Sequence, residues 1–202
     1  MLIFLYGSNM GIKVGIAGGI GSGKTIICHV FKVLGIPVYN ADLEAKLIMN
    51  KSDQVRLAVM QEFGDEAYSN GVLNRAFLAA QVFNDAAKLA QLNRIVHPAV
   101  IQAAEDWADA QTAPYSLKEA SILFESGSYK KVDYSILVTA PIEIRIARVM
   151  ERDQVTREQV LARMNNQMSD EEKTKLADFV IINDGITPII PQVMALHHQF
   201  QK

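Results

Sequence analysis

Residues 16–26 read IAGGIGSGKTI, in which four glycines and one lysine stand among apolar side chains. The β-branched run Ile12–Ala17 predicts a buried strand before the glycines, and the apolar spacing of Thr25–Leu34 predicts a helix after them. Glycines at such a junction let the backbone approach a ligand closely, with successive N–H groups pointing at phosphate oxygens. The segment therefore predicts a site for a nucleoside triphosphate.

The residue types fit the P-loop pattern, Gly-x-x-x-x-Gly-Lys-Thr, from Gly18 to Thr25. The N-terminal dipole of the predicted helix favours a bound anion. Lys24 can bridge the β- and γ-phosphates, and the Thr25 hydroxyl can bind Mg²⁺. We therefore expect ATP or a similar nucleotide to bind here, with Mg²⁺ as cofactor.

The rest of the chain alternates short apolar runs with helical patterns, which predicts an α/β fold with a parallel sheet and helical insertions. The pattern is helical from Ala41 to Trp107, with a break around Tyr68–Val72. Residues 1–9 precede the pattern, and we expect them to be an upstream extension. The further strands are expected at Val38–Tyr39, Ser121–Phe124, Tyr134–Thr139 and Phe179–Ile182, and the later helices at Ile142–Asp153, Arg157–Gln167 and Pro191–Gln199.

Composition excludes several classes of protein. The chain has 202 residues, 50% hydrophobic and 21% charged, which suits a single folded domain with inserted subdomains. The net charge of −2 gives no support for a broad nucleic-acid-binding face. No apolar run reaches the roughly 18 residues of a membrane span. The one cysteine, Cys28, cannot form an intramolecular disulfide and is expected to be buried. We expect a cytoplasmic protein that binds neither nucleic acid nor membrane.

The class of nucleotide-binding protein is narrowed by what surrounds the P-loop. Asn50–Asp53 spells the guanine-reading pattern N-K-x-D, but it lies between two predicted helices without a preceding strand. The chain contains no D-x-x-G, and no run of four apolar residues ends in Asp-Glu as in ATPase motors. The remaining interpretation is a small-molecule kinase.

Two features are candidates for the acceptor side. Asp42 is expected to end the second strand, where it either orients an acceptor hydroxyl as a base or caps the next helix. Arg145, Arg148 and Arg152 share one helical face, which is either a solvated surface or part of a mobile lid. The P-loop favours the lid.

The histidines give weaker signals. His97 precedes Pro98 and has no partner at metal-binding spacing, so we do not expect it to bind a metal. His197 and His198 lie on the predicted C-terminal helix, and we expect both to be exposed.

Taken in order, the motifs of this chain resemble the dephospho-CoA kinase family from about Ile12 to the C-terminal helix. The series is much more specific than the P-loop, which many families share. It comprises GGIGSGK at residues 18–24, AD-x-x-A at 41–45, L-x-R at 73–75, His97-Pro98, LFE at 123–125, YKK at 129–131, R-x-x-x-R-D at 148–153, Gln167 and AD-x-x-I-x-N-x-G at 177–185.

The resemblance implies transfer of a phosphoryl group from ATP to the ribose 3′-hydroxyl of dephospho-CoA, giving CoA and ADP. It also implies a three-layer α/β/α P-loop NTPase fold with five parallel strands. The implied parts are a nucleotide-binding core at 10–45, 115–141 and 174–202, a helical CoA-binding domain at 46–114 and a helical lid at 142–173.

Carried over position by position, the resemblance also implies site residues. Asp42 becomes the candidate base, acting with Lys24 and Arg148 in catalysis, and Thr25 the metal ligand. Dephospho-CoA is expected to contact Asp42, Arg75, His97 and Glu125. The nucleotide is expected to contact Gly21, Ser22, Gly23, Lys24, Thr25, Ile26, Arg148, Arg152 and, near the adenine, Asn183.

The chain departs from the family pattern at three places. Ile26 stands where a second hydroxyl usually follows the P-loop lysine, Ser121-Ile122 where a proline is common, and Asn74 where an aspartate is common. None of these removes a group that phosphoryl transfer needs. Two alternatives stay open: another P-loop kinase, for a nucleoside monophosphate or a small metabolite, and a nucleotide-dependent switch protein.

Overall fold

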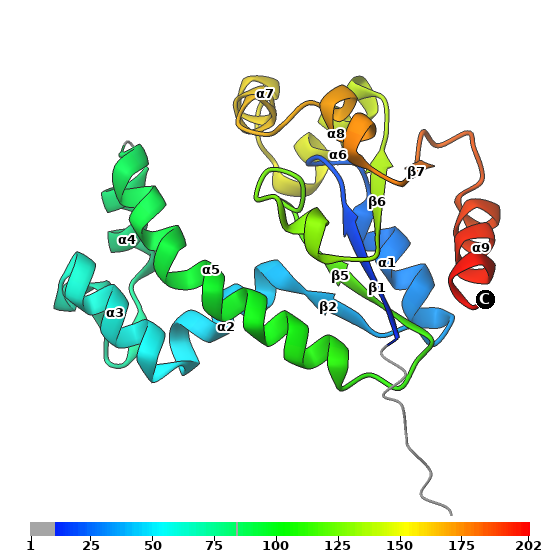
Figure 1. Cartoon of the computed structure of the whole chain (residues 1–202). Coiled ribbons are helices and arrows are strands. Elements are labelled where there is room, and N and C mark those ends of the chain that lie inside the picture. Colours follow the sequence, from blue (N-terminus) through cyan, green and yellow to red (C-terminus); the bar gives the residue numbers. More distant parts are fainter. Residues whose placement is uncertain (1–10, 84) are drawn as a thin grey trace, which may run out of the picture. The chain divides into compact units, whose positions relative to one another are not determined.

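The computed structural model describes residues 11–83 and 85–202. The extension expected at residues 1–9 lies outside the described residues. The described residues divide into two compact units, one formed by residues 11–39 with Ala108–Lys202 and the other by residues within Asn40–Trp107. The first unit carries the main sheet, and the second is mostly helical (Figure 1).

The larger unit is built on a five-stranded parallel sheet with the order β2-β5-β1-β6-β7 (Figure 1). The central strand β1 (Ile12–Ala17) runs parallel to β5 (Tyr115–Glu119) on one side and to β6 (Tyr134–Thr139) on the other. β6 also pairs in parallel with β7 (Phe179–Ile182), while β2 (Val38–Asn40) lies beside β5. Parallel strands need crossover connections, and β1 and β2 are joined by a helix. The predicted P-loop α/β fold with five strands is confirmed.

Two helices bury one face of this sheet: α1 (Lys24–Val33) and α9 (Ile189–Phe200). Burial of such aliphatic and aromatic side chains stabilises a fold by about 1.5–3 kcal/mol each. This packing fixes the start of α1 at the carboxyl end of β1. The buried side chains that meet there include Val14, Ile16, Ile27, Cys28, Phe31, Leu117, Ile136, Val138, Ile181, Val193 and Phe200.

The predicted position of the third strand is wrong. The apolar run Ser121–Phe124 suggested a strand, but β5 is the preceding segment YSLKE, and residues 121–127 form turns. Leu123 is fully buried without being in a strand, because it packs on β1: a Cβ on Gly15 would come within 2.7 Å of it. The lysine and glutamate of YSLKE hide the strand pattern, although four of its five residues are buried.

Three helices lie between β6 and β7 in the sequence. α6 (Ile142–Asp153) has the predicted bounds, and α7 (Arg157–Asn165) ends earlier than the predicted Gln167. α8 (Asp170–Leu176) was not predicted, because DEEKTKL has no apolar periodicity. It begins at a capping box in which the side chains of Ser169 and Glu172 bond each other's backbone N–H groups.

The second unit is helical, as predicted, and has its own core. The predicted break at Tyr68–Val72 is a pair of short antiparallel strands, β3 (Tyr68–Ser69) and β4 (Val72–Leu73). The core consists of Val55, Val59, Ala67, Leu73, Leu78 and Val96. The helices are α2 (Ala41–Lys51), α3 (Asp53–Phe63), α4 (Arg75–Val82) and α5 (Ala86–Asp109), which continues through Pro98.

The expectation that His197 is exposed is wrong, whereas His198 is exposed as expected. His197 lies on the apolar face of α9 and is 7% exposed. Its Nδ1 atom and the hydroxyl of the fully buried Tyr115 form a hydrogen bond of 2.7 Å. Burial lowers the pKa of His197, because a buried imidazolium loses its hydration. The pair therefore couples α9 to β5.

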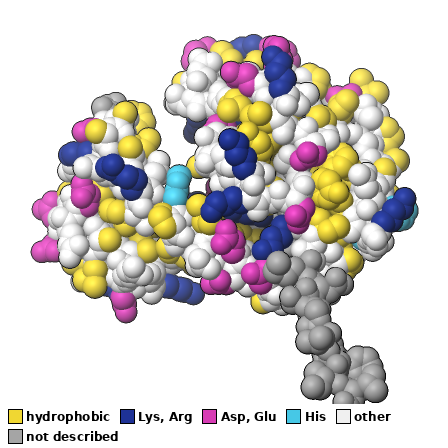
Figure 2. Space-filling model, in the orientation of Figure 1, with side chains coloured by type: hydrophobic (Ala, Val, Ile, Leu, Met, Phe, Trp, Pro, Cys, Tyr) yellow, Lys and Arg dark blue, Asp and Glu magenta, His cyan; other side chains and the backbone are white. Residues whose placement is uncertain are grey.

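No helix in the described part of the chain is long and apolar enough to cross a membrane. The face of the larger unit seen in Figure 2 carries lysine and arginine side chains interspersed with acidic ones. An anionic ligand on this face is therefore bound by a local arrangement of donors rather than by a continuous basic surface.

Candidate phosphate-binding site

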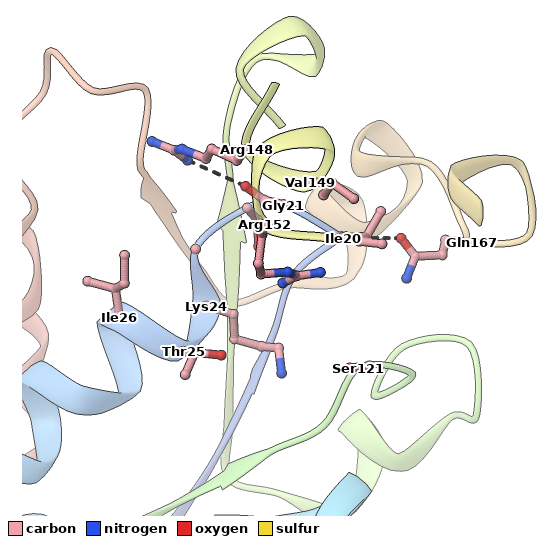
Figure 3. Close-up of a pocket in the computed structure, with 14 residues that line it drawn as sticks. Ile20, Gly21, Lys24, Thr25, Ile26, Ser121, Arg148, Val149, Arg152 and Gln167 are labelled. Carbon is pink, nitrogen blue, oxygen red and sulfur yellow. Dashed lines mark hydrogen bonds between the residues drawn. The ribbon is translucent and has the colours of Figure 1, made fainter. Parts of the chain in front are cut away.

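A pocket of about 580 Å³ surrounds the glycine-rich loop in the larger unit (Figure 3). The loop follows β1 at its carboxyl end, where ligands of open α/β sheets bind. Residues from α6 and from the segment after α7 complete the pocket. Its lining consists of Gly18, Gly19, Ile20, Gly21, Ser22, Gly23, Lys24, Thr25, Ile26, Ser121, Arg148, Val149, Arg152 and Gln167.

The loop has the backbone geometry that its glycines predict. Gly21 and Gly23 have φ values of 80° and 86°, in the left-handed region that other residues rarely adopt. The N–H of Ser22 donates to the carbonyl of Gly19 at 3.0 Å, which closes a turn. α1 begins directly afterwards at Lys24, so its N-terminal N–H groups and its dipole face the pocket.

Lys24 and Thr25 both contact Glu119, the last residue of β5. The Nζ atom of Lys24 lies 2.8 Å from Oε1 of Glu119, and the two side chains are 11% and 6% exposed. The Thr25 hydroxyl donates to the same oxygen at 3.3 Å. A buried carboxylate therefore lies beside the lysine expected to bind phosphate and beside the expected metal ligand.

The sequence analysis missed Glu119 because it placed the third strand too late. Once YSLKE is known to be the strand, the signal is a glutamate at the carboxyl end of a strand that pairs with β1. Glu119 pairs with Ile16 of β1, so it ends its strand directly beside the P-loop. A carboxylate at this position matches the acidic residue that P-loop enzymes use beside the phosphates.

The three arginines of α6 lie in different surroundings and make different contacts. Arg148 donates from Nη1 to the carbonyl of Asn183 at 3.1 Å. The same atom donates to the carbonyl of Gly21 at 3.4 Å (Figure 3). Arg152 is exposed, lines the pocket and forms an ion pair with Asp153 at 2.7 Å. Arg145 is buried and contacts the loop from its outer side. The three residues therefore do not form one solvated face.

Asn183 is buried behind the loop. Its Nδ2 atom donates to the carbonyl of Ser22 at 2.8 Å and lies so close to Gly23 that a Cβ there would come within 2.1 Å of it. This contact explains the glycine at position 23 independently of its φ. The expected position of Asn183 near the adenine stays a prediction.

Ile26 is 57% exposed and lines the pocket from the first turn of α1. An apolar side chain there offers no hydrogen bond to a nucleotide. Ile26 therefore cannot replace the hydroxyl that the resemblance leads us to expect at this position. Only its backbone N–H could donate to a nucleotide.

Asp42 does not occupy the position that the sequence suggested. β2 ends at Asn40, and Asp42 lies in the first turn of α2. The alternative role as helix cap is also wrong, because Asn40 is the N-cap: its Oδ1 accepts from the N–H of Leu43 at 2.9 Å. Asp42 belongs to the smaller unit, and its role as base stays a prediction.

The other residues expected at the acceptor site lie in different units. Arg75 is exposed at the start of α4, and His97 is half-buried in α5; both are in the smaller unit. Glu125 is in the larger unit, where its Oε1 lies 2.7 Å from Nζ of the fully buried Lys173. The same oxygen accepts from the N–H of Met168 at 3.3 Å. Glu125 therefore joins the segment after β5 to α8 and to the residue before its N-cap.

Cys28 is buried in α1, as expected. Burial, together with the charge of Glu119, raises the pKa of its thiol to about 12. A thiol with such a pKa is protonated at neutral pH, so Cys28 is not a nucleophile.

The fold and this site define a nucleotide-binding protein of the P-loop α/β class. Shikimate kinase from Bacteroides thetaiotaomicron has the same fold, with a TM-score of 0.54 at 11% identity over 95% of this chain and 99% of that one. Identity this low shows the fold alone.

Closer comparisons give the family. The family model for dephospho-CoA kinase matches residues 12–188. Dephospho-CoA kinase from Salinibacter ruber is 44% identical over 176 residues, covering 85% of this chain and 88% of the relative. That from Bacteroides fragilis (strain YCH46) is 41% identical over 188 residues, covering 93% and 92%. The chain therefore belongs to the dephospho-CoA kinase family, and the resemblance found in the motifs is confirmed.

Two solved structures are similar to this chain over nearly its whole length. A crystal structure of a Thermus thermophilus protein has a TM-score of 0.81 at 35% identity, covering 94% of this chain and 96% of that one. Dephospho-CoA kinase from Campylobacter jejuni has a TM-score of 0.66 at 25% identity, covering 93% and 95%.

Proposed function

We propose that the protein transfers the γ-phosphoryl group of ATP to the ribose 3′-hydroxyl of dephospho-CoA, giving CoA and ADP. The observation that carries the proposal is the cluster of Lys24, Thr25 and Glu119 at the start of α1, in a chain whose residues 12–188 match this family. The P-loop supports the assignment of a nucleoside triphosphate as the donor. Membership of the family supports the assignment of dephospho-CoA as the acceptor.

The donor side follows from the loop geometry. The backbone N–H groups of Gly21 to Ile26 surround the phosphates, and Lys24 donates to the β- and γ-phosphate oxygens. Arg148 and Arg152 approach from α6 and stabilise charge that develops on the transferred group. Donors that are fixed in place act more strongly on such charge where water is excluded than in open solvent.

Kinases that use ATP generally need a divalent metal ion, and we propose Mg²⁺. The Thr25 hydroxyl and the Glu119 carboxylate lie 3.3 Å apart and are the oxygen donors that Mg²⁺ prefers, the remaining ligands usually coming from phosphates and water. When bound, the ion neutralises negative charge on the β- and γ-phosphate oxygens.

For the acceptor we propose that Asp42 orients the 3′-hydroxyl and accepts its proton as the new O–P bond forms and the bond to ADP breaks. Arg75, His97 and Glu125 are proposed to contact dephospho-CoA. We assign the core, the CoA-binding domain at 46–114 and the lid at 142–173 as the resemblance implies, with closure of the lid excluding water. The single buried cysteine supports a cytoplasmic location, since the fold uses no disulfide.

The test is an acceptor panel. Purified protein is incubated with ATP and Mg²⁺ and with dephospho-CoA, nucleoside monophosphates or no acceptor, and ADP is followed. We expect fast ADP formation with dephospho-CoA alone. Turnover only with a nucleoside monophosphate would support the other kinase class, and acceptor-independent hydrolysis a switch protein. Lys24→Met serves as the inactive control.

A further inference from the structure

The backbone N–H and carbonyl of Ile20, in the middle of the P-loop, are each held by a side chain from elsewhere in the chain. Its N–H donates to Oε1 of Gln167 at 3.0 Å, a contact drawn in Figure 3, and its carbonyl accepts from Nε of Arg145 at 2.9 Å. Its side chain packs with the apolar cluster between α6 and α7, formed by Ile146, Val149 and Val160. The Ile20 N–H is therefore used for structure and not for a phosphate.

Arg145 is itself fixed by an ion pair. Its side chain is 9% exposed, and Nη1 lies 2.9 Å from Oδ1 of Asp170, at the start of α8. The other oxygen of Asp170 accepts from the Thr139 hydroxyl at 2.5 Å, at the end of β6. The guanidinium thus spans from the sheet and α8 to the loop. A planar fork with several donors can make both contacts at once, which a lysine cannot.

Two of the loop glycines fit this arrangement sterically. A Cβ on Gly19 would come within 2.1 Å of Nη2 of Arg145, and one on Gly21 within 2.4 Å of the Arg145 carbonyl oxygen. The loop therefore lies directly against α6, and the glycines at positions 19 and 21 serve this contact as well as the loop conformation.

We infer that Arg145 and Gln167 are positioning residues for the donor substrate. By holding the N–H and the carbonyl of Ile20 they fix the peptide planes on either side of this residue. The carbonyl shares its plane with the N–H of Gly21, so these contacts set the orientation of the N–H groups, from Gly21 onward, that receive the phosphates. Gln167 follows α7 within the segment assigned as the lid, so the same contacts tie movement of that segment to the shape of the loop. The inference rests on the proposed function only in taking ATP as the ligand.

The test is equilibrium binding of ATP, measured by calorimetry without any acceptor. Arg145→Met keeps the length of the stem but removes every donor, and we expect the Kd for ATP to rise about tenfold. Gln167→Leu removes the acceptor for the Ile20 N–H, and we expect a rise of about fivefold. Arg145→Lys retains the charge facing Asp170 and should fall between Arg145→Met and the wild type.

The matched control is Arg157→Met. Arg157 joins α7 to α6 through a bidentate pair with Glu143 at 2.7 Å, but both side chains are exposed and neither lines the pocket. We expect an unchanged Kd for ATP. We also expect the Kd for dephospho-CoA to stay at the wild-type value in every variant.

Unchanged Kd values for ATP in folded Arg145→Met and Gln167→Leu would overturn the inference. So would a loss that appears only as reduced binding stoichiometry at an unchanged Kd, because that is the result of partial unfolding. If Arg145→Met fails to fold, Gln167→Leu decides alone. Because ATP binding is measured without acceptor, a wrong assignment of dephospho-CoA would leave this comparison intact.

Discussion

Glu119 and Lys24 form their ion pair between side chains that are almost completely buried. In such surroundings the attraction is screened little, so the carboxylate fixes the position of the lysine that we propose binds phosphate. The Thr25 hydroxyl shares the same oxygen. At the residue scale, one carboxylate therefore organises both charged partners of the donor: the lysine and the proposed metal.

Glu119→Gln keeps the size of the side chain but removes its charge. We expect kcat to fall by about 10²-fold, and the Mg²⁺ concentration for half-maximal activity to rise. Steady-state kinetics across a Mg²⁺ titration checks this. Glu143→Gln, an exposed glutamate of α6, is the control. A Glu119→Gln enzyme with wild-type kcat and Mg²⁺ response would contradict the role.

Asp42→Asn tests the proposed base. We expect kcat to fall by about 10²-fold or more, with the Kd for ATP largely unchanged, because the P-loop belongs to the other compact unit. The same substitution at Asp53, exposed in the first turn of α3, controls for loss of a helix-terminal charge. Near-normal turnover of Asp42→Asn would rule out Asp42 as the base.

The glycine-rich loop and its place between β1 and α1 could be predicted from the sequence, because local pattern and spacing around Gly23, Lys24 and Thr25 are enough for this. Glu119 could not, because its role depends on which residue ends β5, and that depends on pairing with β1. The sequence correctly predicts that Arg145 lies on α6, but it does not predict that this side chain is buried. Only the packing of α6 against Gly19 shows which of the arginines points inward.

At the element scale, the buried pair of Glu125 and Lys173 docks α8 onto the segment after β5. Lys173 is fully buried, and this carboxylate lies 2.7 Å from its Nζ atom as the counter-charge. The sequence analysis missed α8 because a short charged helix has no periodic apolar signal. Its position is set by tertiary contacts of this kind.

Glu125→Gln leaves Lys173 buried without its counter-charge. We expect the free energy of unfolding to fall by about 2–3 kcal/mol, with part of the loss recovered in the double variant Glu125→Gln/Lys173→Met. Urea denaturation measures both. Glu171→Gln, which breaks the exposed pair with Lys175, should change the free energy by less than about 0.5 kcal/mol. Equal effects of the two glutamate variants would contradict this account.

The docking of α9 should depend on pH through His197. Its pKa in the folded protein lies below the usual 6.5, because burial disfavours the imidazolium. The unfolded chain therefore binds the proton more tightly, so the contribution is complete above pH 6.5 and is lost as the pH falls below it.

Urea denaturation at pH 7.5 and pH 5.5 tests this. His197→Asn keeps an acceptor for the Tyr115 hydroxyl but cannot be protonated, and we expect a smaller loss of stability at pH 5.5 than in the wild type. His198→Asn is the exposed control: because burial is the main cause of the lowered pKa of His197 and the charge of His198 the lesser one, this variant should keep most of the wild-type pH dependence. An identical pH dependence in His197→Asn would show that His197 is not responsible.

At the scale of the whole molecule, the chain joins a P-loop unit to a helical unit with its own core. The class of fold and the helical middle could be predicted, because strand and helix patterns alternate outside Ala41–Trp107 and are helical within it. The proposed reaction needs groups from both: Lys24, Glu119 and Arg148 for the donor, and Asp42 for the acceptor.

The most direct test of the central claim follows the phosphorus atom. The protein is incubated with dephospho-CoA, Mg²⁺ and ATP labelled in its γ-phosphate, and the product is examined by mass spectrometry and phosphorus NMR. We predict one ADP for each CoA formed, with the label on the ribose 3′-oxygen. Label released as inorganic phosphate, or found on any other hydroxyl, would contradict the proposed function.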